Sequence, residues 1–173
     1  MNTVRERRLQ SDYTRLSNLV SASGGKLAIE TMRGTPPETY LLVCQGTSIA
    51  AVKDAEVIYC KKQHLKIELG AEYPAMPPLV TVLSSIFHPH VWPQNNVVCL
   101  GPWNITEALD NLVMRLYSIV AFDPEHMNWK SVANHDAATW ASRNQHLFPL
   151  GQLASRDSPA PSSRTIRGWY ESA

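Results

Sequence analysis

The sequence predicts an α+β domain, and three observations carry this prediction. An amphipathic helical pattern comes first, strand-like segments with alternating apolar residues follow, and two further helical patterns come after an irregular stretch. Consecutive strand segments joined by short turns predict an antiparallel meander, with helices at its flanks. The 173 residues suffice for one such domain and a tail. We place the domain at residues 1–148 and a flexible tail, which contains Ser, Pro and Arg, at 149–173.

The first helix is expected from about residue 3 to 22. Its apolar residues recur at helical spacing on one face, at Leu9, Tyr13, Leu16 and Val20. The pair Gly24-Gly25 is expected to end it.

Strands are expected at about 26–31, 39–45, 55–60 and 64–69, and residues 79–84 are expected as the fourth core strand of the meander. The segment 64–69 alternates most clearly between apolar and polar side chains. Turns are expected at 34–37 and 45–48, where Gly, Pro, Thr and Ser gather. Residues 85–103 contain few alternating apolar positions, so we expect an ordered irregular segment of the kind that carries function.

Two helices are expected after this segment. Asn104 and Glu107 have the spacing of a capping box, and an apolar stripe follows them until Asp123-Pro124 ends the helix. The stripe consists of Ile105, Leu109, Leu112, Leu116 and Val120. A shorter helix is expected over about 132–144.

The bulk composition argues against several classes of function. The net charge of +1 gives no global field for nucleic acid or a membrane surface. No apolar run is long enough for a transmembrane helix, and the polar N-terminus does not have the pattern of a secretory signal. The 3 cysteines are scattered and form no disulfide framework, which predicts a reducing, cytoplasmic location.

Cys99 is the candidate nucleophile. It follows the polar stretch 93–96 in irregular chain, whereas Cys44 and Cys60 lie within strand patterns and are expected as small core residues. A zinc site formed by Cys99 with His88 and His90 lacks an evident fourth ligand. A cysteine protease would need a histidine base, and His90 or His126 is available, but no orienting partner is evident.

The order of motifs around Cys99 is similar to that of the ubiquitin-conjugating enzyme family. Tyr73-Pro74 and Pro77-Pro78 lead into a strand, His88-Pro89-His90 follows, and Val97-Val98-Cys99-Leu100 precedes Trp103. The resemblance runs from the first helix to about residue 146. It implies the fold of that family, in which the cysteine carries a ubiquitin-like protein as a thioester. It implies three partners: the ubiquitin-like protein, its activating enzyme, and a target protein with an acceptor lysine. No metal or small cofactor is implied.

The resemblance also implies roles for residues around the cysteine. The family has an asparagine after His-Pro that stabilises the oxyanion; His90 stands there and is the first candidate donor, with Asn95 or Asn96 as the second. Glu125 or His126, in the loop that borders the cysteine, is expected to orient or deprotonate the amine. The residues expected to be structural near the site are His88, Pro89 and Trp103.

The first helix resembles the family's helix that meets the activating enzyme, and its basic residues Arg5, Arg7 and Arg8 are expected to bind that partner. The histidine at position 90 and the short interval from Cys99 to Trp103 look like the bacterial branch of the family, which belongs to systems associated with defence against phage. Two alternatives remain. A non-catalytic relative would bind the ubiquitin-like protein without the thioester, and a thiol hydrolase would release the acyl group to water.

Overall fold

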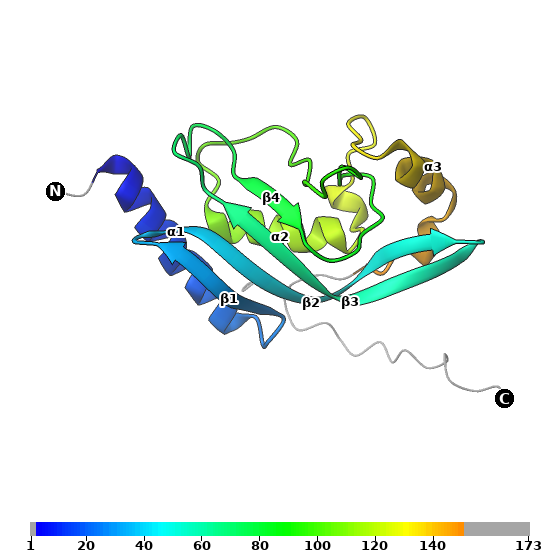
Figure 1. Ribbon diagram of the computed structural model, residues 1–173, viewed down its shortest axis with the longest axis horizontal. Coiled ribbons are helices and arrows are strands. Elements are labelled where there is room, and N and C mark those ends of the chain that lie inside the picture. The colour runs from blue at the N-terminus through cyan, green and yellow to red at the C-terminus, as the bar shows by residue number, and fades with distance from the viewer. Residues whose placement is uncertain (1–2, 151–173) are drawn as a thin grey trace.

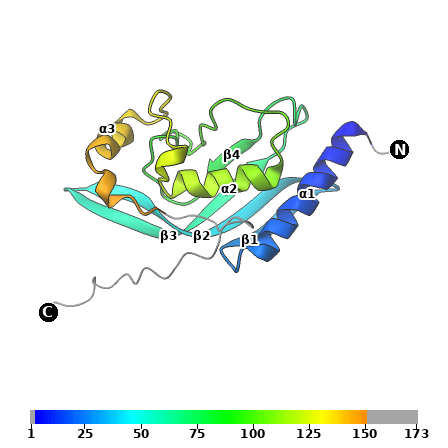
Figure 2. The same ribbon diagram turned by 180° about the vertical axis from the view of Figure 1, so that it is seen from behind.

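A four-stranded antiparallel sheet in the order β1-β2-β3-β4 forms the centre of this computed structural model, which describes residues 3–150. Two helices lie on one face of the sheet, α1 beside β1 and α2 across the middle (Figures 1 and 2). The elements are α1 (Val4–Ala22), β1 (Leu27–Gly34), β2 (Pro37–Lys53), β3 (Glu56–Glu68), β4 (Leu79–Val82), α2 (Leu109–Val120), η1 (Pro124–His126), α3 (His135–Arg143) and η2 (Gln145–Leu147). The predicted α+β class and the order of its elements are confirmed.

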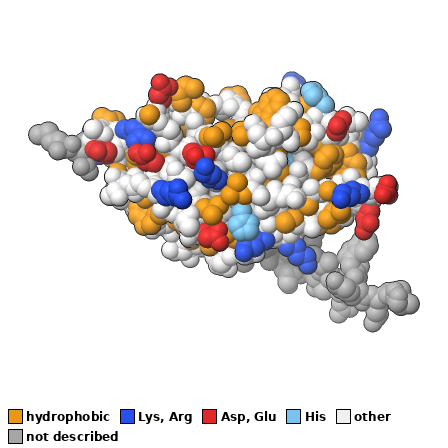
Figure 3. Space-filling model, in the orientation of Figure 1, with side chains coloured by type: hydrophobic (Ala, Val, Ile, Leu, Met, Phe, Trp, Pro, Cys, Tyr) orange, Lys and Arg blue, Asp and Glu red, His pale blue; other side chains and the backbone are white. Residues whose placement is uncertain are grey.

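The helices and the sheet enclose one main core. The apolar stripe of α1 contributes Leu9 and Leu16, both fully buried, and the inward side chains of the strands and of α2 complete the cluster. The opposite face of the sheet, seen in Figure 3, carries hydrophobic and charged side chains side by side. A second cluster lies under α3, at the far end of the long β2–β3 hairpin, and includes Ile49, Phe122, Met127, Ala141 and Phe148. No helix within residues 3–150 is long and apolar enough to cross a bilayer.

The strands differ from the prediction at two places. Residues 45–48 do not form a turn, because β2 continues through them with a shift of register opposite β3. The Tyr117 hydroxyl donates to the Gln45 carbonyl at 2.7 Å, and Gly46 leaves room for that ring: a Cβ at Gly46 would lie 2.8 Å from the Tyr117 oxygen. The segments expected at 55–60 and 64–69 are a single strand, β3, because pairing with β2 continues between them.

The start of α2 was predicted too early. Asn104 accepts a hydrogen bond from the Thr106 N–H at 3.0 Å and so closes a turn of its own, and Ile105 is 57% exposed. The helix begins at Leu109, whose N–H donates to the buried Asp12 carboxylate of α1 at 3.0 Å. A side chain 97 positions away thus supplies the hydrogen bond that a local capping residue usually makes.

The last helix, α3, is shorter than predicted because residues 132–134 are held in a loop. The N–H groups of Ala133 and Asn134 both donate to the Pro89 carbonyl, at 2.8 and 3.0 Å. The Asn134 side chain then caps the helix by accepting from the Ala137 N–H. The irregular segment before Cys99 is therefore bonded directly to the loop that leads into α3.

The two strand cysteines differ in burial. Cys44 lies in the core as predicted, and burial raises the pKa of its thiol to about 12, so it stays protonated. Cys60 is only half-buried, and its thiol donates to the Lys62 carbonyl, so its prediction as a core residue was wrong. It lies on the part of β3 that extends beyond the main core.

Candidate functional site

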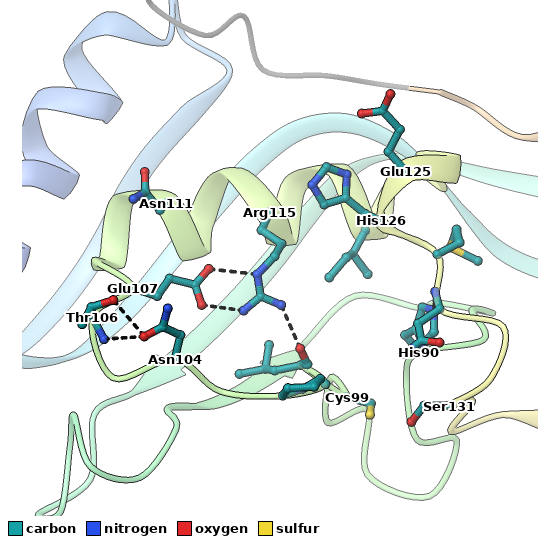
Figure 4. A pocket seen from close by; sticks show the side chains of 16 residues that line it. His90, Cys99, Asn104, Thr106, Glu107, Asn111, Arg115, Glu125, His126 and Ser131 are labelled. Atoms are coloured by element: carbon teal, nitrogen blue, oxygen red, sulfur yellow. Dashed lines mark hydrogen bonds and ion pairs between the residues drawn. The ribbon is translucent and has the colours of Figure 1, made fainter.

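Cys99 lies at the wall of a groove of about 640 Å³ (Figure 4). Four parts of the chain form this groove: His90 in the irregular segment, residues 99–107, one side of α2, and the loop that follows α2. The Cys99 thiol is partly exposed, in contrast to the buried Cys44. A partly exposed thiol at a groove is accessible to a protein-sized acyl donor, as a nucleophilic cysteine needs to be.

The backbone around Cys99 is held on both sides. Before it, Val98 pairs with Val91 in an isolated antiparallel bridge, and the Cys99 N–H donates to the His90 carbonyl at 2.8 Å. After it, the Leu100 carbonyl accepts from Arg115 at 2.8 Å, and the Leu100 side chain packs against the main core. The sulfur therefore projects from a backbone with little freedom.

His88 lies in the core, and its ring joins the irregular segment to α2. It is fully buried; Nε2 bonds to the Ile119 carbonyl at 2.7 Å, and Nδ1 accepts from the His90 N–H at 3.0 Å. The ring also packs edge-on against Phe122. Burial, with the neighbouring His90 as a smaller cause, lowers the pKa of His88 to about 3, so the ring is neutral. Its position is that of a structural residue.

The hydrogen bond of His90 Nε2 differs from what an oxyanion donor requires, because this nitrogen accepts a hydrogen bond from the backbone. Its side chain is 3% exposed, and Nε2 accepts a hydrogen bond from the Asn128 N–H at 2.9 Å. An accepting Nε2 carries no proton, so the ring proton is on Nδ1. The ring also bonds to the Ser131 backbone, and burial lowers its pKa. Nε2 therefore joins the ring to the loop after α2 and cannot donate to an oxyanion, so the interpretation of His90 as the oxyanion donor does not fit the geometry at this nitrogen.

Asn95 and Asn96, unlike His90, lie outside the groove that Cys99 lines. They form a turn between Trp92 and Val97, in which Asn96 has a positive φ of 56° and its N–H donates to the Trp92 carbonyl at 2.8 Å. The Asn95 carboxamide oxygen accepts from the Val97 N–H at 3.1 Å. The Asn95 side chain and the Asn96 backbone serve the turn, and neither residue lines the groove, so their interpretation as alternative oxyanion donors does not fit the structure.

Glu125 and His126 both line the groove, from the short helix η1. Figure 4 shows the Glu125 carboxylate directed away from Cys99. The His126 Nδ1 atom lies 3.5 Å from the Asp123 carboxylate, and its side chain is one third exposed. Of these two residues, His126 is the one beside a carboxylate, a neighbour that the sequence did not reveal, although its Nδ1 makes no hydrogen bond in the structure.

Trp103 joins the segment after Cys99 to the Tyr-Pro stretch before β4. Its indole N–H donates to the Pro74 carbonyl at 2.8 Å, and its ring lies 6.2 Å from that of Tyr73. The bond and the ring contact both face the protein, so Trp103 fixes the segment after Cys99 against the Tyr-Pro stretch.

The three basic residues of α1 differ in their surroundings. Arg5 pairs with Glu38 at 2.7 Å and donates to two backbone carbonyls. Arg8 pairs with Asp12 at 2.7 Å and donates to the carbonyls of the chain before α2. Arg7 is exposed. The structure thus gives Arg5 and Arg8 partners within the protein, and Arg7 is the one of the three whose side chain faces solvent.

Several groove residues were not singled out from the sequence as site residues, among them the polar residues Glu107, Arg115, Asn128 and Ser131. Glu107 and Arg115 form a bidentate ion pair, with distances of 2.9 and 2.8 Å. No local pattern marks such a pair, because Glu107 precedes the helix and Arg115 lies within it. Asn128 and Ser131 are polar residues of an irregular loop and have no periodicity to reveal their positions.

Within residues 3–150, there is no group of three or more His, Cys, Asp or Glu side chains that could hold a metal ion.

A sequence profile of the family described as ubiquitin-conjugating enzyme matches residues 49–150, more than half of the 173-residue chain. This chain belongs to the ubiquitin-conjugating enzyme family. The matched region contains Cys99, the groove and the loop after α2.

Two solved structures share the fold of this family member. One is a Plasmodium yoelii protein assigned as a ubiquitin conjugating enzyme, with a TM-score of 0.58 at 14% identity over 86% of this chain and 90% of its own. The other, described as a novel ubiquitin-conjugating enzyme, has a TM-score of 0.57 at 17% identity over 83% of this chain and 88% of its own. At these identities the likeness concerns the fold.

Proposed function

We propose that the protein is a ubiquitin-conjugating-like acyltransferase with Cys99 as its nucleophile. The observation that carries this proposal is the partly exposed Cys99 thiol at the groove, on a backbone restrained on both sides. In the loading step the Cys99 thiolate attacks the thioester that joins a ubiquitin-like protein to an activating enzyme. The new C–S bond forms on Cys99, and the activating enzyme's thiolate leaves.

In the second step an amine, in our proposal a lysine of a target protein, attacks the thioester carbonyl. The C–N bond forms, the C–S bond breaks, the Cys99 thiolate leaves and the amine loses a proton. A free lysine is protonated at neutral pH, with a pKa near 10.4. His126, beside Asp123 and one third exposed at the groove, is our candidate to orient the amine or accept that proton.

The partners in this proposal are the ubiquitin-like protein, its activating enzyme and the target. A reducing cytoplasm would keep the thiol free for them. The bacterial origin and a role in defence against phage remain predictions of the sequence. They are tested by the genes beside this one, which should encode a ubiquitin-like protein and an activating enzyme.

The loading experiment uses purified protein, the adjacent activating enzyme, the ubiquitin-like protein and ATP. We expect a mass adduct that a thiol reductant removes. Cys99→Ser should give no adduct, or one that resists reductant, because an oxyester exchanges less readily than a thioester. Cys60→Ser is the matched control: it changes the other cysteine that is not fully buried, and it should load as the wild type does.

Three outcomes would contradict the proposal. An adduct that persists in Cys99→Ala would place the acyl group on another residue. Tight, non-covalent binding of the ubiquitin-like protein, with no adduct in the wild type, would favour a binding module on the same fold. Hydrolysis of the Cys99 thioester, with release of the ubiquitin-like protein at the same rate with and without an amine, would indicate a hydrolase.

A further inference from the structure

Arg115 lies in the groove beside Cys99, and its bond to Leu100 is the only part of its surroundings used above. Its side chain is 23% exposed and that of its partner Glu107 is 17% exposed. Nε and Nη2 donate to the two Glu107 carboxylate oxygens, and Nη1 donates to the Leu100 carbonyl at 2.8 Å (Figure 4). One guanidinium thus joins α2, the chain before α2 and the residue that follows Cys99.

The bond to Leu100 completes a pair of restraints around Cys99. On one side the Cys99 N–H is bonded to the His90 carbonyl. On the other side the Leu100 side chain packs against the core, but the next residue is Gly101, which has a positive φ of 69° and no side chain, so the Arg115 bond is the polar restraint on the backbone there. Thioester transfer needs the reacting atoms placed accurately, and small displacements are costly in rate.

Glu107 holds the guanidinium in the orientation that this bond requires. Paired bidentate hydrogen bonds from arginine to a carboxylate fix the plane of the guanidinium. The Glu107 backbone is fixed in turn, because its carbonyl accepts a hydrogen bond from Arg8 of α1. The charge of Arg115 is balanced by Glu107, so the bond to the Leu100 carbonyl, and not a free positive charge, is what Arg115 offers the site.

We propose that Arg115, oriented by Glu107, is a positioning residue that restrains the backbone at Cys99 and Leu100 for thioester transfer. The inference rests on the proposed function of Cys99. Lysine cannot replace arginine here, because a single ammonium cannot bond both carboxylate oxygens in a fixed plane and reach the Leu100 carbonyl as well.

The test compares Arg115→Met and Arg115→Lys with Tyr117→Phe. Tyr117→Phe is the matched control, since it also removes a bond from α2 to a backbone carbonyl, but on the sheet side. Each protein is loaded at Cys99, and single-turnover discharge is followed against amine concentration. We expect both Arg115 variants to lose about tenfold or more of the maximal rate, with a half-saturating amine concentration close to that of the wild type. Tyr117→Phe should keep the wild-type rate.

Iodoacetamide, which needs only an exposed thiol, should alkylate Cys99 of the Arg115 variants about as fast as that of the wild type. A wild-type discharge rate in Arg115→Met, or full recovery of the rate in Arg115→Lys, would overturn the inference. So would equal losses of rate in Arg115→Met and Tyr117→Phe.

Hydrogen exchange of the unloaded protein separates this inference from the proposed function. The Cys99 amide, which donates to the His90 carbonyl, should exchange faster in Arg115→Met than in the wild type and be unchanged in Tyr117→Phe. If the wild type forms no thioester, the proposed function fails, and a positioning role in transfer fails with it. If the wild type loads and the exchange rates are unchanged in Arg115→Met, only the positioning role fails.

Discussion

The His90 ring accepts a hydrogen bond from the Asn128 backbone N–H at 2.9 Å, and this bond joins the segment before Cys99 to the loop after α2. The two residues are 38 positions apart in the chain. Because the ring is buried and Nε2 is occupied as an acceptor, His90 links the two sides of the site, and Nε2 has no proton for a developing oxyanion.

The first prediction concerns His90. His90→Ala leaves the Asn128 N–H without its partner, so we expect a loss of about 1–3 kcal/mol in the free energy of unfolding. Loading and discharge should slow together, and His90→Asn should not restore discharge selectively. His135→Ala, which changes an exposed histidine at the start of α3, is the control. Normal loading with slow discharge in His90→Ala, rescued by asparagine, would instead identify an oxyanion donor.

The second prediction concerns the pH dependence of stability. An unfolded histidine has a pKa near 6.5, whereas burial lowers the pKa of His88 to about 3 and also lowers that of His90. The unfolded state therefore binds more protons below pH 6.5. The free energy of unfolding should decrease as the pH falls from about 6.5, by up to about 1.4 kcal/mol per pH unit for each of the two rings.

Urea unfolding at several pH values checks this dependence. His88→Gln removes one titrating ring, so its stability should depend less steeply on pH between about 6 and 4, even if it is less stable at pH 8. His135→Gln, at an exposed position, should keep the wild-type slope. A slope in His88→Gln equal to that of the wild type would show that another group causes the acid sensitivity.

The third prediction separates His126 from Glu125. If His126 accepts the amine proton, His126→Gln should load normally and discharge to lysine about a hundredfold more slowly. Glu125→Gln should have a smaller effect, because its carboxylate is directed away from Cys99 (Figure 4). Discharge of the preloaded thioester measures both. Equal effects of the two substitutions would refute the distinction.

The fourth prediction concerns the buried Asp12, which joins α1, the Tyr-Pro stretch and α2. Its carboxylate accepts from Arg8, from the Tyr73 hydroxyl at 2.6 Å and from the Leu109 N–H. Asp12→Ala leaves these donors unpaired, so we expect a loss of about 3 kcal/mol or more in the free energy of unfolding. Tyr73→Phe removes one of the bonds and should cost about 1–2 kcal/mol. A smaller loss in Asp12→Ala than in Tyr73→Phe would contradict the central position of Asp12.

The fifth prediction concerns recognition of the activating enzyme by α1. Arg7 is exposed, whereas Arg5 and Arg8 are engaged within the protein, so Arg7→Glu tests recognition without disturbing the fold. Loading should slow at low salt, and the difference should shrink as salt is added, because exposed charges steer association. Arg33→Glu makes the same change of charge on β1 and should load normally. Equal loading of the two variants at low salt would refute a role for Arg7.

The sequence by itself determined the α+β class, the order of the elements and the position of the candidate cysteine. These features depend on local patterns. The apolar face of α1 and the alternation in β3 report burial directly, and a cysteine in irregular chain stands apart from one in a strand such as Cys44. The similarity of the motifs around Cys99 to one family is also a property of the sequence, and the family is confirmed. Of the tail expected at 149–173, residues 151–173 lie outside the described residues.

Only the tertiary structure decided which polar side chains face the cysteine and which face the protein. The capping of α2 by Asp12, the bond from Asn128 to His90 and the bond from Arg115 to Leu100 join elements that no sequence period relates. Buried polar groups must find hydrogen-bond partners, and long-range packing selects them. For that reason His90 and Asn96 could be placed near Cys99 along the chain but not assigned a role, and Arg115 was not expected at the site at all.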